Sequence, residues 1–143
     1  MAMRSDTKYL QSAVIPFMFE NGVLKVLLII SRSGKRWVIP KGCIEDDLTS
    51  LESAVEEAYE EAGIKGRAYK KAIGKYRYRK WGGICHVEVF LFEVNEVLQE
   101  WPEASFRQRA WVTVEEAAER VVEKALKSII RRVPELVNRI RVR

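Results

Sequence analysis

Three glutamates near the end of one predicted helix are the residues whose spacing best suits chemistry. Glu57, Glu60 and Glu61 follow an E-x-x-E-E pattern within GCIEDDLTSLESAVEEAYEEAGI, residues 42–64. At 100° per residue, their side chains project within an arc of about 100°. Carboxylate oxygens grouped on one helical turn are suitable ligands for hard divalent cations. The spacing therefore predicts a cation site at the edge of this helix.

The charge of the surrounding segment favours the same prediction. Eight of the 20 acidic residues lie between residues 45 and 61, and no Lys or Arg occurs from residue 42 to residue 64. Like-charge pairs four residues apart, such as Glu52–Glu56 and Glu57–Glu61, each destabilise an exposed helix by about 0.2–0.5 kcal/mol. A solvated acidic face with partners elsewhere in the fold is the alternative interpretation.

The rest of the chain is strongly basic. Setting those eight acids aside leaves 25 basic and 12 acidic residues, a charge of +13, although the whole chain has a formal net charge of +5. Basic fields attract anions such as phosphates or nucleic acid. The end of the chain, residues 127–143, forms a predicted basic helical tail. Stabilisation by the helix dipole is the favoured explanation there, ahead of a nucleic-acid or partner contact.

Length and composition predict one cytoplasmic domain spanning residues 1–143. No apolar run approaches the roughly 20 residues of a membrane span, and the first residues lack the apolar core of a signal peptide. Cys43 and Cys85 are expected to stay reduced, and a zinc site is not expected. The single histidine, His86, is expected to be a half-buried structural residue.

Hydrophobic patterning predicts helices packed on a sheet. Thr49 and Glu52 form a capping box for a helix that runs to about Ala62, and Gly63 follows its end. Asn21-Gly22 predicts a hairpin between the first two strands. The expected order is β-β-β-α-β-β-β-α, an α+β or mixed α/β arrangement. The expected strands are 12–20, 23–30, 36–40, 67–79, 84–94 and a short strand before residue 114; a helix follows over 114–132, and Pro134 starts a short final helix or tail.

The glutamate-rich segment resembles the Nudix box, G-x5-E-x7-R-E-U-x-E-E-x-G-U, where U is bulky and apolar. Gly42 and Gly63 fall on its glycines, and the three helical glutamates fall on its glutamates. The preceding RWVIPKG is similar to a lead-in common in that family. Leu48 and Glu56 depart from the pattern, where the family has a glutamate and an arginine. Glu45, or Asp46 and Asp47, are expected to replace the missing loop carboxylate.

The resemblance implies a Nudix-type α/β/α sandwich with a central mixed sheet. It implies hydrolysis of a pyrophosphate bond with Mg²⁺ or Mn²⁺, in which water attacks phosphorus. The implied metal ligands are the Gly42 carbonyl with Glu57, Glu60 and Glu61. These glutamates are also the implied catalytic residues, but their roles as ligand or base stay undivided. A base from another loop is the alternative, and Glu100 and Glu103 are the residues that fit its position.

Other stretches resemble the diphosphoinositol polyphosphate and diadenosine polyphosphate hydrolase branch. They are SRSGKRW at residues 31–37, FEVNEVLQEWPE at residues 92–103 and RQRAWVTVEEA at residues 107–117. Arginine suits such substrates because its guanidinium makes bidentate contacts with phosphate oxygens. The implied substrate-binding residues are Arg32, Arg36, Lys41, Arg107 and Arg109. The basic residues of KYRYRKW extend this surface: Lys75, Arg77, Arg79 and Lys80.

The expected function is hydrolysis of a small, highly phosphorylated substrate, such as a dinucleoside polyphosphate or a diphosphoinositol polyphosphate. Nucleotide clean-up and removal of pyrophosphate from RNA 5′ ends are the next enzymatic alternatives. A non-catalytic Nudix-fold module that binds a nucleotide or RNA is the alternative of another class. No membrane partner is expected, nucleic acid is the less favoured partner, and the chain is expected to be a monomer or a homodimer.

Overall fold

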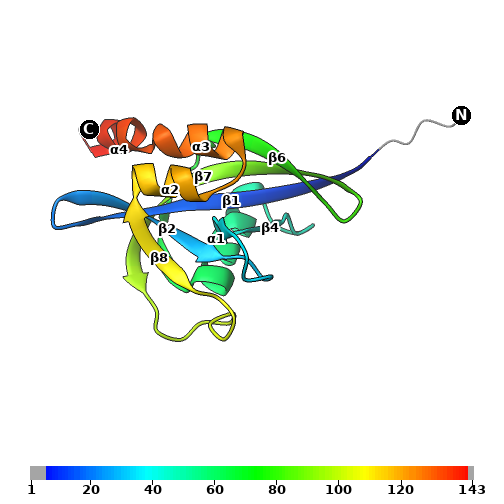
Figure 1. Ribbon diagram of the computed structural model, residues 1–143, viewed down its shortest axis with the longest axis horizontal. Coiled ribbons are helices and arrows are strands. Elements are labelled where there is room, and N and C mark those ends of the chain that lie inside the picture. Colours follow the sequence, from blue (N-terminus) through cyan, green and yellow to red (C-terminus); the bar gives the residue numbers. More distant parts are fainter. Residues whose placement is uncertain (1–5, 142–143) are drawn as a thin grey trace, which may run out of the picture.

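The computed structural model describes residues 6–141, in which one mixed sheet carries helices on both faces (Figure 1). The chain order runs from a strand hairpin, through the glutamate-rich helix, to a group of short C-terminal helices. The elements are β1 (Thr7–Glu20), β2 (Val23–Ile30), β3 (Trp37–Val38), β4 (Lys41–Cys43), α1 (Ser50–Ala62), β5 (Ile64–Ala68), β6 (Gly74–Lys80), β7 (Gly83–Val97), β8 (Arg109–Thr113), α2 (Val114–Arg120), α3 (Lys124–Arg131) and α4 (Val133–Arg141).

The sheet is built around two long central strands, β1 and β7. These two pair in parallel, and the other strand pairs are antiparallel. The main path runs β3-β2-β1-β7-β5, while β4 joins β1, β6 joins β7 and β8 joins β2. The expected mixed sheet is therefore confirmed.

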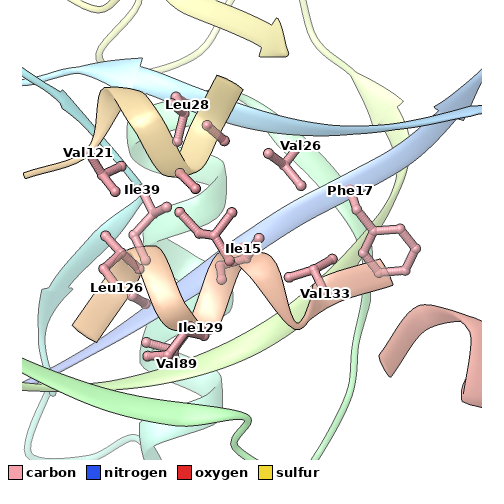
Figure 2. Packing of buried hydrophobic residues seen from close by; sticks show 14 of the residues in the cluster. Ile15, Phe17, Val26, Leu28, Ile39, Val89, Val121, Leu126, Ile129 and Val133 are labelled. Atoms are coloured by element: carbon pink, nitrogen blue, oxygen red, sulfur yellow. The ribbon is translucent and has the colours of Figure 1, made fainter. Parts of the chain in front are cut away.

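Two hydrophobic cores lie on opposite faces of the sheet. Strand residues such as Ile15 and Val89 pack against Leu126 and Ile129 of α3 in the larger core, which also includes residues of α2 and α4 (Figure 2). Successive strand residues point to opposite faces. Val14 and Phe90 accordingly join the second core, under α1. The expected α/β/α sandwich is confirmed.

The local signals for the first hairpin and for α1 are also confirmed. Asn21 and Gly22 both have positive φ, at 52° and 78°, as a tight hairpin turn requires. The Thr49 hydroxyl accepts a hydrogen bond from the Glu52 N–H, and the Glu52 carboxylate accepts one from the Thr49 N–H. Gly63 ends α1 with φ of 64°. The sequence therefore predicted both the hairpin turn and the two ends of α1 correctly.

Several predicted strand boundaries differ from the structure. β1 begins at Thr7 rather than at residue 12, because its first residues pair with the start of β7. The predicted strand 67–79 is two strands, β5 and β6, which both pair with β7. Ala68 pairs with Phe92, and Gly74 pairs with Val89. The chain therefore advances six residues between β5 and β6 while β7 advances only three, and the extra residues bulge out of the sheet. β4, which follows Pro40, was not predicted.

The predicted helix over residues 114–132 is also wrong, because the chain breaks it into α2 and α3. Val121 has an extended backbone conformation, with ψ of 158°, and its side chain is buried. The Lys127 ammonium donates hydrogen bonds to the Ala118 and Glu119 carbonyls at the end of α2. Helical periodicity continues across residues 121–123, so hydrophobic pattern alone could not reveal this break.

The basic end of the chain is helical in the part that the structure describes. α4 begins at Val133, and Val133 and Val137 are buried in the larger core. Residues 142–143 of the predicted tail lie outside the described residues, as do residues 1–5. Among helices between residues 6 and 141, none has both the length and the apolar character needed to cross a membrane.

Replacing Thr49 with alanine should lower the free energy of unfolding by about 1 kcal/mol, because the Glu52 N–H loses its acceptor. Urea denaturation followed by circular dichroism measures this change. Glu52→Gln is the matched control, since glutamine can still accept from the Thr49 N–H. Equal stability of Thr49→Ala and the unmodified chain would contradict a stabilising cap.

Candidate functional site

The start of the site is a close contact between β4 and α1. β4 pairs with β1, and the Pro40 carbonyl accepts a hydrogen bond from the Val14 N–H. This pairing places Gly42 directly against the Glu57 side chain. A Cβ at position 42 would overlap the Glu57 carboxylate, so any larger residue would displace it. Glycine is therefore required here by space rather than by a turn.

An open cavity of about 490 Å³ lies beside this contact, and we call it the site cavity. Its acidic side contains Glu57, Glu60 and Glu61 of α1, together with Glu103 from the loop between β7 and β8. The Glu103 N–H donates to the Glu60 carbonyl at 3.1 Å, which fixes the loop against the helix end. Of the two carboxylates considered from that loop, Glu103 lines the cavity and Glu100 does not.

The grouped carboxylates are electrostatically strained. Burial raises the pKa of Glu57 to about 8, and the negative charges of Glu61 and Glu60 add to the effect. Burial likewise raises the pKa of Glu60 and of Glu61, although Arg107 opposes the rise for Glu61. A cation at this position would favour the ionised carboxylates. The electrostatics of the acidic side therefore match a site for positive charge.

The residues present fit a divalent cation as a partial ligand set. Within residues 6–141, no three Asp, Glu, His or Cys side chains already converge as a complete metal site. Glu61 also accepts a hydrogen bond from the Lys41 N–H at 3.1 Å. Mg²⁺ commonly uses one or two carboxylates and completes its octahedron with water and substrate phosphate oxygens. The oxygen donors and their unbalanced negative charge agree with that pattern.

Cationic side chains also line the site cavity. The residues predicted to bind substrate from this part of the chain, Arg32, Arg36 and Lys41, all line it. Arg79 and Lys80 of the β6–β7 hairpin line it as well, next to Trp81. Arg32 is 71% exposed and lies 3.6 Å from Glu103, so its guanidinium remains accessible at the mouth. Lys41 is deep in the cavity. Burial lowers the pKa of its ammonium, which the nearby Glu61 carboxylate partly offsets.

Arg107 lines the cavity but is committed to protein contacts. Its side chain is only 6% exposed, and its guanidinium lies 3.3 Å from Glu61 and 2.9 Å from Glu103. It also donates to the Ile30 carbonyl at 2.9 Å. The predicted substrate-binding residue is thus a buried brace that joins α1, the β7–β8 loop and the end of β2.

Arg109 differs from its predicted role, because it does not line the site cavity. It donates to the Ala62 carbonyl at 3.0 Å, at the C-terminal end of α1. Its guanidinium lies 3.8 Å from the centre of the Trp101 ring, and Trp101 itself donates to the Glu61 carbonyl. Arg109 therefore caps and covers the end of α1 instead of facing the cavity.

Hydroxyl groups brace the loop before α1 and the first turn of α1. The Nudix pattern instead has a glutamate in that loop and an arginine in the helix. The Ser53 hydroxyl accepts from the Glu45 N–H at 3.0 Å, and the Ser50 hydroxyl donates to the Glu88 carboxylate at 2.6 Å. Glu56, which stands at the arginine position, is exposed on the outer side of α1. Within the described chain, the proposed carboxylate replacements form no ion pairs: Glu45, Asp46 and Asp47.

Sequence reasoning missed the polar floor of the site cavity. Gln11 and Tyr78 line it, and the Tyr78 hydroxyl donates to the Gln11 side-chain carbonyl at 2.7 Å. The Lys41 ammonium lies 5.2 Å from the Tyr78 ring centre. Residues 11 and 78 meet only because β1 and β6 flank β7. No local sequence signal marks such a contact.

Comparison with known proteins gives the chain its family. The family profile described as "NUDIX domain" matches residues 9–133. The chain belongs to the Nudix family. It is 42% identical over 111 residues to Nudix hydrolase 13, mitochondrial, of Arabidopsis thaliana, covering 71% of this chain and 54% of that protein. This Nudix chain thus spans about half the length of that curated relative.

Two further relatives cover more of their own length. The Nudix chain is 35% identical over 132 residues to Nudix hydrolase 16, mitochondrial, of Arabidopsis thaliana, covering 80% of this chain and 73% of that protein. It is 30% identical over 109 residues to diphosphoinositol polyphosphate phosphohydrolase 3-alpha of Mus musculus, covering 75% of this chain and 65% of that protein. The resemblance to the Nudix hydrolase family, including a diphosphoinositol polyphosphate relative, is confirmed.

Among solved structures, the fold is similar to an Ap4A hydrolase of C. elegans in a binary complex. The TM-score is 0.80 at 19% identity, with 91% of this Nudix chain and 98% of that chain covered. At that identity the likeness concerns the fold. It agrees with the mixed sheet and flanking helices described above.

Replacing Arg107 with methionine should lower the free energy of unfolding by about 3–5 kcal/mol, because Glu61 and Glu103 lose the charge that balances them. Urea denaturation measures the loss. Arg36→Met is the matched control on the exposed side of the same cavity, and its effect should stay within about 0.5 kcal/mol. Similar stabilities of the two variants would contradict the bracing role of Arg107.

Mg²⁺ should raise the thermal unfolding midpoint of the unmodified Nudix chain, because a ligand that binds only the folded state stabilises it. The gain is about 2.7 kcal/mol at a Mg²⁺ concentration 100 times the dissociation constant. Glu57→Gln should lose this response, as measured by calorimetry with and without metal. Glu56→Gln, on the outer side of the same helix, should keep it. Equal responses of both variants would argue against Glu57 as a ligand.

Proposed function

We propose that this Nudix chain hydrolyses a phosphoanhydride bond with the help of Mg²⁺ or Mn²⁺. One observation carries the proposal: acidic and cationic side chains line a single open cavity. The acidic side suits a divalent cation, and the cationic side suits phosphate groups. A polyphosphate substrate is the ligand that needs both at once.

The proposed substrates are dinucleoside polyphosphates or diphosphoinositol polyphosphates. Such molecules carry several adjacent phosphates, and Arg32 and Arg36 offer guanidinium groups at the cavity mouth. Arg79 and Lys80 extend this positive surface along the β6–β7 hairpin. The sequence likeness to a diphosphoinositol polyphosphate phosphohydrolase supports this class. A nucleoside triphosphate has fewer phosphates with which to use the same contacts.

In the proposed reaction, different residues bind the phosphates, hold the cation and accept the proton. Arg32 and Arg36 bind the phosphate chain, and Lys41 neutralises charge deeper in the cavity. Glu57 and Glu61, beside Gly42, hold the cation, which when bound neutralises phosphate oxygens and helps to activate water. Glu60 or Glu103 accepts the proton as water oxygen attacks phosphorus and the bond to the leaving phosphate breaks. Arg107 keeps Glu61 and Glu103 in place throughout.

A non-catalytic nucleotide-binding module remains the second candidate function. The observation that favours it is the engagement of Glu61 by Arg107 and by the Lys41 N–H, which leaves that carboxylate fewer free lone pairs. Such a module would bind the same anions through the same cationic side of the cavity. Only turnover separates the two functions.

The test is product release from a substrate panel, with and without Mg²⁺. The panel contains diadenosine polyphosphates, diphosphoinositol polyphosphates, nucleoside triphosphates and 5′-triphosphorylated RNA. We expect metal-dependent turnover, fastest for the most anionic small molecules, and a loss of about 100-fold or more in Glu61→Gln. Glu56→Gln serves as the charge-matched control and should retain activity. Binding of the panel by folded protein without turnover would favour the binding module.

A further inference from the structure

A second cavity, of about 480 Å³, is lined mainly by residues of β1, β6 and β7. We call it the reverse-face cavity. Leu10, His86 and Arg77 stand on one rung of the strand register, and side chains on one rung project to the same face. The next rung contains Tyr76 and Val87, which are buried in the core beneath α3. The Leu10 rung therefore points away from α3, toward the side that carries α1.

Cationic groups surround this cavity on three successive same-face rungs. Lys8 belongs to the first rung, Arg77 to the second and Lys75 to the third. Rungs on the same face are about 6.8 Å apart, because each strand residue rises about 3.4 Å. Lys75 and Arg77 thus follow one another along β6, while Lys8 lies on β1, on the other side of β7, and all three line the cavity.

These cations are available to a ligand. Within the part of the chain that the structure describes, Lys8, Lys75 and Arg77 form no ion pair. One acid, Glu88, also lines the cavity, but its carboxylate accepts the hydrogen bond from Ser50 of α1. The positive charge of the lining is therefore only partly balanced.

One apolar and one ionisable side chain, Leu10 and His86, also line the cavity. Leu10 is 55% exposed and forms an apolar surface beside the half-buried His86 imidazole. Desolvation lowers the pKa of His86, and the positive charges of Lys8 and Arg77 lower it further. Both cations therefore act on the same ring. An anion bound between them would offset their repulsion of the imidazolium form.

We propose that the reverse-face cavity, whose lining shares only Gln11 with the site cavity, is a second binding site for a ligand with adjacent phosphate groups. Lys8, Lys75 and Arg77 contact the phosphates, and His86 lies beside them. Inorganic polyphosphate and the phosphate chain of a nucleotide share this chemistry. Binding at this site requires neither a metal ion nor hydrolysis. A negative result in the binding test would therefore leave the proposed function untouched, and a positive result would not depend on it.

The sequence supplies its own reporter for the test. His86 is the single histidine of the 143-residue chain, so its ring protons give one identifiable set of NMR signals. Inorganic tripolyphosphate is titrated into metal-free protein at neutral pH. We expect a saturable shift of the His86 signals. No saturable shift at millimolar tripolyphosphate would overturn the proposal.

Two matched double variants assign the response to one cavity. Lys75→Ala with Arg77→Ala should weaken the tripolyphosphate affinity seen at His86 by about tenfold or more, because two charge-assisted contacts are lost. Arg32→Ala with Arg36→Ala removes cations from the site cavity and should leave that affinity unchanged. The reverse result would place the anion in the site cavity and overturn the proposal. Lys8→Ala provides an independent variant of the same surface.

Further ligands distinguish the sources of the phosphate chain. ATP with the same affinity as tripolyphosphate would mean that phosphates alone are recognised, whereas tighter ATP binding would add a nucleoside contact at Leu10. Either result supports the site. Saturation by a single-stranded RNA with a 5′-hydroxyl, without saturation by tripolyphosphate, would overturn the small-ligand proposal in favour of a nucleic-acid surface.

Discussion

The buried Arg107 guanidinium is the interaction on which the geometry of the site cavity depends. It joins Glu61 of α1, Glu103 of the following loop and the last carbonyl of β2. These three elements are distant in sequence, and the Arg107 guanidinium contacts all of them at one point. A buried arginine between two carboxylates is tolerated because all three charges are paired, whereas any one of them alone would be costly to bury. The same pairing leaves the remaining carboxylates, notably Glu57, without an equivalent partner. That imbalance is the electrostatic reason for proposing a cation at this position.

Acidic and basic residues of this Nudix chain are concentrated in different elements. α1 concentrates acids, while β6 and the loop after β2 supply cations. Repulsion within α1 destabilises the helix. The capping box, the buried alanine face and the Ser53 contact with the preceding loop help to hold it. The separation suits a ligand that is anionic but bridged by a cation. It also explains why a protein with a net positive charge carries a strongly acidic helix.

Successive side chains of β6 point to opposite faces of the sheet. Tyr78 turns toward the site cavity, and Arg77 turns toward the reverse-face cavity. The sequence predicted that the basic residues of KYRYRKW extend one phosphate-binding surface, but the structure divides them between two cavities. Arg79 and Lys80, near the hairpin turn, line the site cavity, while Lys75 and Arg77 line the cavity behind it. A period-2 pattern indicates that two faces exist, but only the neighbouring strands show what each face meets.

The sequence by itself determined the local chemistry of this protein: the Asn21-Gly22 turn, the capped helix α1, the family and the three glutamates on one helical edge. Each depends on short-range backbone geometry or on a fixed spacing, which the order of residues encodes directly. Tertiary structure decided which distant residues meet. Arg107 bridges two carboxylates, and Arg109 binds the carbonyls at the end of α1. Tyr78 donates a hydrogen bond to Gln11, and the predicted helix after residue 114 is interrupted at Val121. These outcomes depend on strand pairing and on packing between elements far apart in the chain. Hydrophobic periodicity carries no information about such contacts, because the same pattern is compatible with several neighbours.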